Sequence, residues 1–180
     1  MPVSEFEIVV KEDGTGTYST LLQNDKTTQA IQITPPLRDK LFNALRSFHS
    51  MKGDACDLKL KNLAFTGKKT LEYSDEAGRW QCEYIYPADE RIQQVNDAMQ
   101  AVAYTMDEGA TLERLLRHDR LGLDAEMQTL VQAVKDGRAV ELQNIQQTLH
   151  GIAEDDRVMM RVRTQAEKLL KMAAEGGKPA

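Results

Sequence analysis

The densest group of potentially reactive side chains lies between His118 and Asp124, in the order His-Asp-Arg-Leu-Gly-Leu-Asp. An imidazole titrates near neutral pH and can act as an acid or a base, while carboxylates and a guanidinium can orient it or bind an anionic group. This composition fits a small hydrolase or transferase whose site lies where the two halves of the chain meet. The candidate catalytic residues are His118, Asp119, Arg120 and Asp124.

The same segment also has a structural interpretation, which we favour. His and Arg suit the negatively charged end of a helix, Gly122 suits the position where that helix stops, and Asp124 suits the N-cap of a following helix. The order His-Asp-Arg also differs from the His-Arg-Asp of a kinase catalytic loop. We therefore expect these residues to join two helices rather than to form an active site.

A second group combines lysines with aromatic residues in a stretch that alternates as β-strands do. The candidate nucleic-acid contacts are Lys59, Lys61, Lys68 and Lys69. Lysines beside aromatic side chains on a sheet are typical of proteins that stack single-stranded RNA bases. Tyr73 and Trp80 are more simply explained as residues of a hydrophobic core, and a net charge of −5 disfavours phosphate binding. A weak RNA-binding sheet is therefore an alternative, and nucleic acid is disfavoured as a partner.

The sequence predicts no metal site and no cofactor. The segment from Thr66 to Thr70 resembles part of a phosphate-binding loop, but Asn62 stands where the first glycine belongs and Lys69 where Ser or Thr belongs. His49 and His150 each lack a second histidine four residues away, so no helical metal pair is present.

Cys56 and Cys82 lie 26 positions apart and form no Cys-x-x-Cys motif, so neither a redox pair nor a zinc ribbon is predicted. They are either two buried thiols or a disulfide, and both alternatives remain open. The first residues lack the basic start and apolar stretch of a secretory signal, which favours the cytoplasm for the chain as given. A processed chain with a Cys56–Cys82 disulfide would instead be periplasmic or secreted. No apolar run approaches the roughly 18 residues of a membrane-spanning helix.

The elements that position these residues change in character near Pro87. Nine of the ten aromatic residues lie before this point, and no proline occurs between Ala88 and Lys178. Aromatic and β-branched residues favour strands, whereas an uninterrupted run of helix formers favours helices. We predict an α+β protein with an antiparallel sheet and one helix over residues 1–87, a helical bundle over 88–175, and a flexible tail over 176–180.

The first part should form a sheet of about five to six strands with one packed helix. A hairpin is predicted around the turn at residues 13–16, followed by a strand containing Ile31 and Ile33. A helix follows Pro36, with an apolar stripe that consists of Leu37, Leu41, Leu45 and Phe48. Strands resume at Leu58, with a change of phase near Asn62, and end in a hairpin formed by residues 69–75 and 79–86.

The second part should contain about four helices. The first carries apolar residues from Ile92 to Met106 and is predicted to end or kink at Gly109. Asp124 is predicted to cap the next helix and Gly137 to end it, and two further helices follow after short connections. Short connections make consecutive helices pack against one another.

Because no catalytic motif is present and structural roles account for nearly every residue considered, the leading interpretation is a non-enzymatic protein-interaction or scaffold module with an unknown protein partner. The hydrolase or transferase and the RNA-binding sheet are the alternatives.

Overall fold

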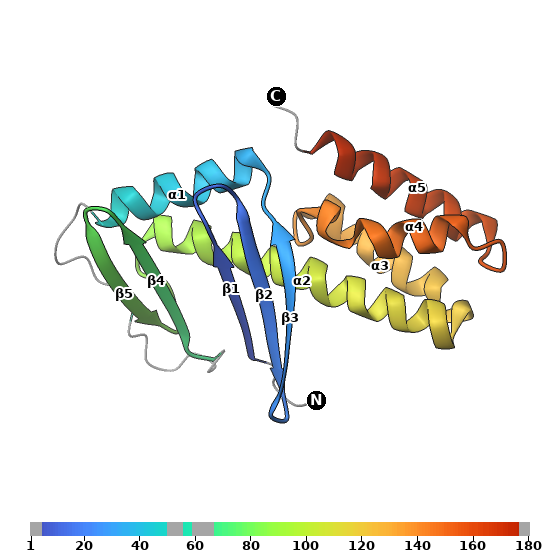
Figure 1. Cartoon of the computed structure of the whole chain (residues 1–180), viewed down its shortest axis with the longest axis horizontal. Helices are drawn as coiled ribbons and strands as arrows, with labels where there is room; N and C mark the ends of the chain where they lie inside the picture. Colours follow the sequence, from blue (N-terminus) through green and yellow to red (C-terminus); the bar gives the residue numbers. More distant parts are fainter. Residues whose placement is uncertain (1–4, 50–55, 59–66, 177–180) are drawn as a thin grey trace. The chain divides into compact units, whose positions relative to one another are not determined.

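The computed structural model describes residues 5–49, 56–58 and 67–176, and it is an α+β protein (Figure 1). Five strands and five α-helices occur in these ranges, together with two short 3-10 turns, η1 and η2. In chain order they are β1 (Glu5–Val10), β2 (Thr15–Leu22), β3 (Asp25–Gln32), α1 (Pro35–His49), β4 (Lys69–Asp75), β5 (Gly78–Tyr84), α2 (Glu90–His118), η1 (Arg120–Gly122), α3 (Leu123–Lys135), η2 (Leu142–Ile145), α4 (Gln146–Glu154) and α5 (Met160–Glu175).

The chain divides into two compact units. The first combines residues 1–38 with residues 99–180, and the second consists of residues 39–98. Both α1 and α2 contribute residues to each unit. The boundaries between these units therefore lie within helices. Of the predicted tail, residues 177–180 lie outside the described residues.

The first unit contains a three-stranded antiparallel sheet in the order β1-β2-β3, which confirms the predicted hairpin and third strand. Tyr18 on β2 lies opposite Ile8 on β1 and Gln29 on β3. Gly14 in the first turn has a φ of 88°, and a Cβ there would lie 2.6 Å from the carbonyl oxygen of Ile33. Glycine is required at this turn because a side chain would meet both a disfavoured φ and this close approach.

The prediction of one sheet with five to six strands is wrong for the described residues, where β4 and β5 form a separate two-stranded sheet. Alternation along a strand predicts which side chains share a face and which neighbours form a hairpin. It does not predict whether the edge of one hairpin pairs with another. The predicted strand that resumes at Leu58, with its phase change near Asn62, falls on residues 59–66, which lie outside the described residues.

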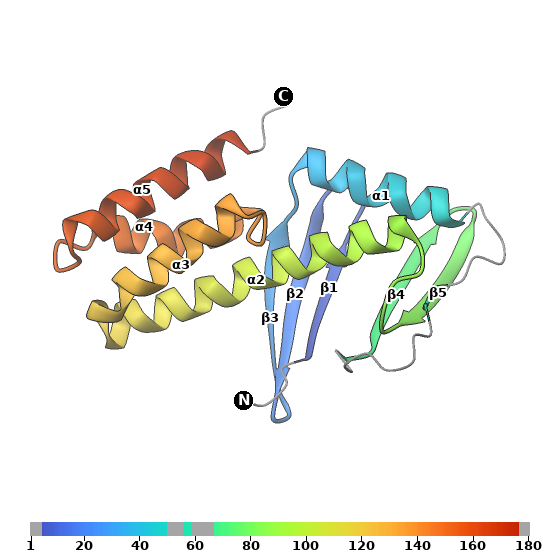
Figure 2. The same ribbon diagram turned by 180° about the vertical axis from the view of Figure 1, so that it is seen from behind.

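The helices of the first unit share one hydrophobic core with the sheet, and Figure 2 shows their order from behind. Tyr18 on β2 packs in this core, and its hydroxyl donates to Asp107 on α2 over 2.6 Å. The side chains in this core with least exposure are Leu112, Leu123, Met127, Leu130, Ala133, Leu149, Ile152, Val162 and Ala166.

The helix does not end at Gly109, because α2 continues through this residue to His118. A Cβ at position 109 would lie 2.4 Å from Cγ2 of Ile145, which belongs to η2. Gly109 therefore allows another segment to approach the helix backbone closely, which is a second reason for glycine within a helix besides termination.

The second unit is built on the β4–β5 hairpin, whose observed strands agree closely with the predicted ones. Cys82 and Tyr84 face inward from β5 and form a small core with Phe48 of α1 and Ile92 of α2. The stripe of α1 is buried at Leu41, Leu45 and Phe48.

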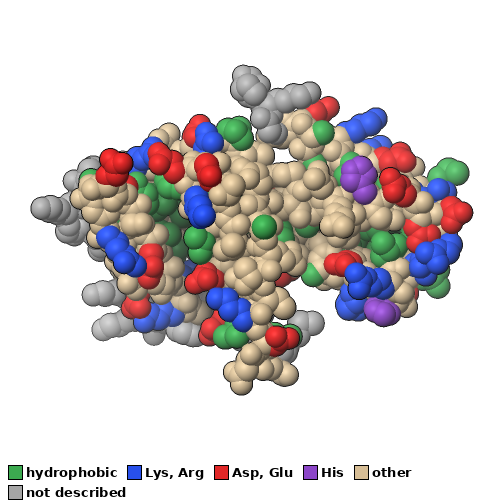
Figure 3. All heavy atoms as spheres, viewed as in Figure 1, with side chains coloured by type: hydrophobic (Ala, Val, Ile, Leu, Met, Phe, Trp, Pro, Cys, Tyr) green, Lys and Arg blue, Asp and Glu red, His purple; other side chains and the backbone are tan. Residues whose placement is uncertain are grey.

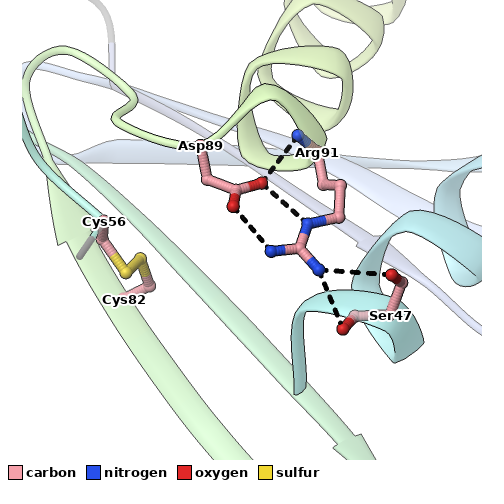
Figure 4. Close-up of polar contacts among 5 residues, drawn as sticks. All are labelled: Ser47, Cys56, Cys82, Asp89 and Arg91. Atoms are coloured by element: carbon pink, nitrogen blue, oxygen red, sulfur yellow. Dashed lines mark hydrogen bonds and ion pairs between the residues drawn. A yellow bond between two sulfur atoms is a disulfide. The ribbon is translucent and has the colours of Figure 1, made fainter. Parts of the chain in front are cut away.

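A guanidinium joins the end of α1 to the start of α2 within the second unit (Figure 4). Arg91 forms two bonds with the Asp89 carboxylate, of 2.8 Å and 2.6 Å. Its Nη1 also donates to the carbonyl oxygen of Ser47, at 3.0 Å, and its guanidinium carbon lies 5.3 Å from the ring centre of Phe48. The hydrogen bonds from Arg91 hold the pKa of Asp89 below its usual value.

Candidate functional site

The four candidate catalytic residues bind separate structural partners. His118 ends α2 with an exposed side chain. Asp119 caps η1, because its side chain accepts a hydrogen bond of 3.3 Å from the backbone N–H of Gly122. Arg120 donates to Asp155 over 3.2 Å, and Asp124 pairs with Arg161. Within the described parts of the chain, no hydrogen bond or ion pair connects His118 with the other three candidates, so the geometry gives an acid–base site no support.

The predicted N-cap at Asp124 is wrong. Helix α3 begins at Leu123, and Asp124 lies in its first turn with its side chain directed to Arg161. The 3-10 turn η1 leads directly into α3, so helical geometry starts earlier than the sequence predicts. The capping role passes to Asp119, which binds the N–H three residues further along.

Two turns lie side by side at one end of the helices of the first unit, and we call them the helical tip. They are residues 118–124, between α2 and α3, and residues 155–161, between α4 and α5. The Arg120–Asp155 and Arg161–Asp124 pairs join them. Asp155 is held further by the Arg157 side chain, which donates to both carboxylate oxygens over 2.9 Å. These bonds, chiefly those from Arg157, hold the pKa of Asp155 well below its usual value.

The helical tip exposes large apolar side chains. Leu121 is 81% exposed, Met160 is 73% exposed and Met159 is 38% exposed. Residues on either side explain this arrangement: Leu123 and Val158 are buried and anchor the two turns, so their neighbours point outward. Figure 3 shows apolar side chains in green among blue and red charged groups at the right-hand end of the view, where these turns lie. The sequence analysis considered only the reactive residue types here and missed the apolar side chains.

The lysines of the possible RNA-binding sheet are not arranged as a free basic surface where they are described. Lys59 and Lys61 lie outside the described residues. Lys68 pairs with Glu83 at 2.8 Å, and the amino group of Lys69 donates to the carbonyl oxygen of Ile85 at 3.2 Å.

The aromatic residues of that hairpin pack against other rings. Tyr73 and Trp80 lie with their ring centres 5.8 Å apart, and Trp80 also lies 5.0 Å from the ring of Phe48. Phe42 meets Tyr73 edge to face at 6.4 Å. These contacts place the rings in the packing of the second unit rather than in a row open for base stacking.

Cys56 and Cys82 are joined by a disulfide, with their Cα atoms 6.0 Å apart (Figure 4). Cys82 is buried on β5, and Cys56 packs against the same small core. The bond holds the short bridge between Asp57 and Pro87 next to the hairpin. Disulfides persist mainly outside the reducing cytosol, so this bond is compatible with the periplasmic or secreted alternative.

A pair of acidic side chains on two helices was not found by the sequence analysis. Burial, together with the neighbouring Glu126 carboxyl on α3, raises the pKa of Glu108 on α2 to about 7. Tyr104 lies one turn before Glu108, and the guanidinium carbon of Arg138 lies 5.7 Å from its ring centre. No local motif connects positions 108 and 126, which are 18 residues apart.

Comparisons with known proteins supply no further assignment: no family model, no curated protein and no solved structure matches this chain. Among the residues that the structure describes, no three His, Cys, Asp or Glu side chains are grouped so as to hold a metal ion. In the same ranges, no helix is both long enough and apolar enough to cross a membrane.

Proposed function

We propose that this chain is a non-enzymatic protein-interaction module that docks onto its partner through the helical tip. The observation that carries this proposal is the exposure of Leu121 and Met160, at 81% and 73%, on two turns joined by ion pairs. The backbone of well-anchored turns loses little conformational freedom on binding, which favours association through the apolar side chains that they expose.

The partner surface that fits this tip is an apolar pocket in another protein. Residues 113–124 carry three acidic and three basic side chains, and residues 154–163 carry the same numbers. Because these charges balance, attraction to a strongly anionic surface such as nucleic acid or an acidic membrane is not favoured. Met and Arg are enriched at protein interfaces, and a methionine side chain adapts to irregular pockets.

The enzyme alternative has weaker support because Asp119, Arg120 and Asp124 each hold a turn in place. The RNA-binding alternative also has weaker support, because the described lysines bind protein groups and the aromatic rings pack against one another.

The test compares Leu121→Asp/Met160→Asp with a control, Met172→Asp. Met172 lies on α5 and is 48% exposed, so the control places a charge on an exposed methionine away from the tip. Each form is immobilised, proteins retained from the source organism are identified, and the affinity of the main one is then measured with purified components. Truncating an interface hot spot costs about 2 kcal/mol or more, so we expect at least about a 30-fold weaker affinity for the tip variant and little change for the control.

Equal affinity of wild type and tip variant contradicts the proposal. Failure of the wild type to retain any protein above a blank support contradicts it as well. Because the substituted side chains are exposed, all three forms should unfold within about 0.5 kcal/mol of one another, and this measurement separates lost binding from lost folding.

A further inference from the structure

One edge of the three-stranded sheet is formed by β3, and a side chain closes this edge at its end (Figure 1). The backbone N–H of Gln32 donates to the side-chain oxygen of Asn144 over 2.8 Å, and the carbonyl oxygen of Gln32 accepts from the side-chain nitrogen of Asn144 over 3.0 Å. Both backbone groups of Gln32 therefore point away from β2. The amide of Asn144 occupies the place that a peptide group of a fourth strand would take.

The rest of this edge presents the same groups without such a cover. Backbone groups alternate in direction along an antiparallel strand, so those of Ala30, Thr28 and Lys26 also point away from β2. Within the described residues, no hydrogen bond reaches the backbone N–H or C=O of these three residues from that side. All residues of β3 except Ile31 are exposed. The edge therefore offers donors and acceptors at a spacing that an extended backbone matches.

The centre of the edge lacks the usual protection against pairing. Proteins commonly protect an edge strand with charged side chains, prolines or a covering segment. Strand β3 contains no proline, and Asn144 covers it at Gln32. Its charged residues, Asp25 and Lys26, both lie at the turn end, and the Lys26 amino group is 3.7 Å from a carboxylate oxygen of Glu7. The edge from residue 27 to residue 30 is therefore neutral.

We propose that a second copy of this chain pairs with this edge, with the two β3 strands antiparallel about a twofold axis at Thr28. In this register Thr28 lies opposite Thr28 of the second copy, and Lys26 lies opposite Ala30. Each of these pairs exchanges both of its backbone hydrogen bonds, because all the groups involved point across the interface. The result is one continuous antiparallel sheet in which both copies use the same surface. The inference is independent of the proposed docking at the helical tip.

Charge and backbone pairing favour this register over its neighbours. An axis at Lys26 would place two like charges opposite each other, which destabilises a strand pair. An axis at Ala30 or Gln29 would direct the second copy onto Gln32, whose backbone groups are already bound. An axis at Thr27 would leave Ala30 opposite the turn of the second copy, so fewer backbone groups would pair.

The side chains at the axis are also compatible with pairing. The Thr28 hydroxyl lies 2.9 Å from the Ser19 hydroxyl on β2, on the face of the sheet opposite Tyr18. Two Thr28 side chains that meet at the axis would extend this contact between hydroxyls into the second copy, and such Thr–Thr pairs stabilise strand pairing. The contact is small, so we expect a dissociation constant between about 1 µM and 1 mM.

The first experiment measures sedimentation of the full chain from about 5 µM to about 1 mM. It compares wild type, Thr28→Pro and a matched control, Thr28→Val. Proline removes the outward N–H at the axis, so Thr28→Pro should raise the dissociation constant at least about fivefold. The control keeps the backbone N–H and a β-branched side chain, so it should stay within about threefold of the wild type. A wild type that is monomeric at all these concentrations overturns the proposal.

The second experiment tests the register with charge at position 30, and it does not depend on how proline affects folding. Ala30→Glu would face Lys26 of the second copy and should strengthen the dimer, whereas Ala30→Lys should weaken it, each by about twofold to 30-fold over the two symmetric pairs. The net charge of −5 would give the opposite order, because an added lysine reduces the repulsion between copies. Equal effects of the two variants, or the order that net charge gives, overturn the proposal. Urea unfolding midpoints of dilute samples should agree for these two variants and the wild type, which separates lost pairing from lost folding.

Discussion

Breaking the Cys56–Cys82 disulfide should destabilise the second unit by an amount that the loop length predicts. The bond closes a loop across 26 positions of the sequence. In the chain-entropy treatment, a cross-link of this span lowers the entropy of the unfolded chain by about 12 cal/mol/K, which corresponds to about 3.5 kcal/mol of stability near room temperature. Such a loss is a large fraction of the roughly 5 to 15 kcal/mol by which domains are stable.

The protein contains a probe for this measurement in Trp80. It is the only tryptophan in the chain, and it lies on β5 two residues from Cys82, with its ring 5.0 Å from that of Phe48. Its fluorescence therefore reports unfolding of the second unit rather than an average over the whole chain. Urea unfolding is recorded for oxidised and reduced wild type, and for Cys56→Ala/Cys82→Ala with and without reductant.

Comparison of the oxidised and reduced wild type isolates the covalent bond, because the side-chain atoms are otherwise the same. We expect the reduced form to be less stable by about 3.5 kcal/mol. Reductant should leave the double variant unchanged, which controls for effects on other groups. The reasoning is refuted if the oxidised and reduced wild type unfold within about 0.5 kcal/mol of each other.

Two further predictions concern packing in the first unit. Gly109→Ala should destabilise by about 1 to 3 kcal/mol despite the better helix propensity of alanine, because its Cβ would lie 2.4 Å from Ile145. Thermal unfolding of Gly109→Ala and of the double variant Gly109→Ala/Ile145→Ala checks this prediction. A Gly109→Ala protein that is as stable as the wild type contradicts it. Thr105→Val should cost about 2 kcal/mol, because the buried hydroxyl donates to the carbonyl oxygen of Val140 at 2.7 Å and accepts from its N–H at 3.0 Å. The matched control is Thr164→Val, at an exposed position of α5, and it should change the free energy of unfolding in urea by less than about 0.5 kcal/mol. Equal losses in the two variants would show that the Val140 contacts do not matter.

Local patterns predicted much of the secondary structure. Alternation and turn residues predicted the β1–β2 hairpin and the β4–β5 hairpin, and β4 has its predicted bounds at Lys69 and Asp75. Helical spacing of apolar residues predicted the stripe of α1 that is buried at Leu41, Leu45 and Phe48. These predictions succeed because side-chain direction repeats every two residues in a strand and every 3.6 residues in a helix.

The candidate site depended on contacts that no local pattern contains. The residue types from His118 to Asp124 allowed an acid–base site besides the favoured structural interpretation. The tertiary structure directs Arg120 to Asp155 and Asp124 to Arg161. Leu121 is exposed because Leu123 is the leucine of this turn that is buried in the core. The residue types around these positions do not predict which of the two leucines is buried. A side chain's partner, and hence its role, is set by which distant segment packs beside it.

The amino-acid sequence by itself determined the α+β class, the places where most elements begin and end, and the short connections between the later helices. The tertiary structure decided that α2 passes through Gly109, since only the approach of Ile145 explains a glycine there. It also decided that Glu108 lies partly buried near Glu126, which raises the pKa of Glu108 to about 7. The physical reason is range: propensity and periodicity act within a few residues, whereas burial, ion pairing and pKa depend on groups brought together across the chain.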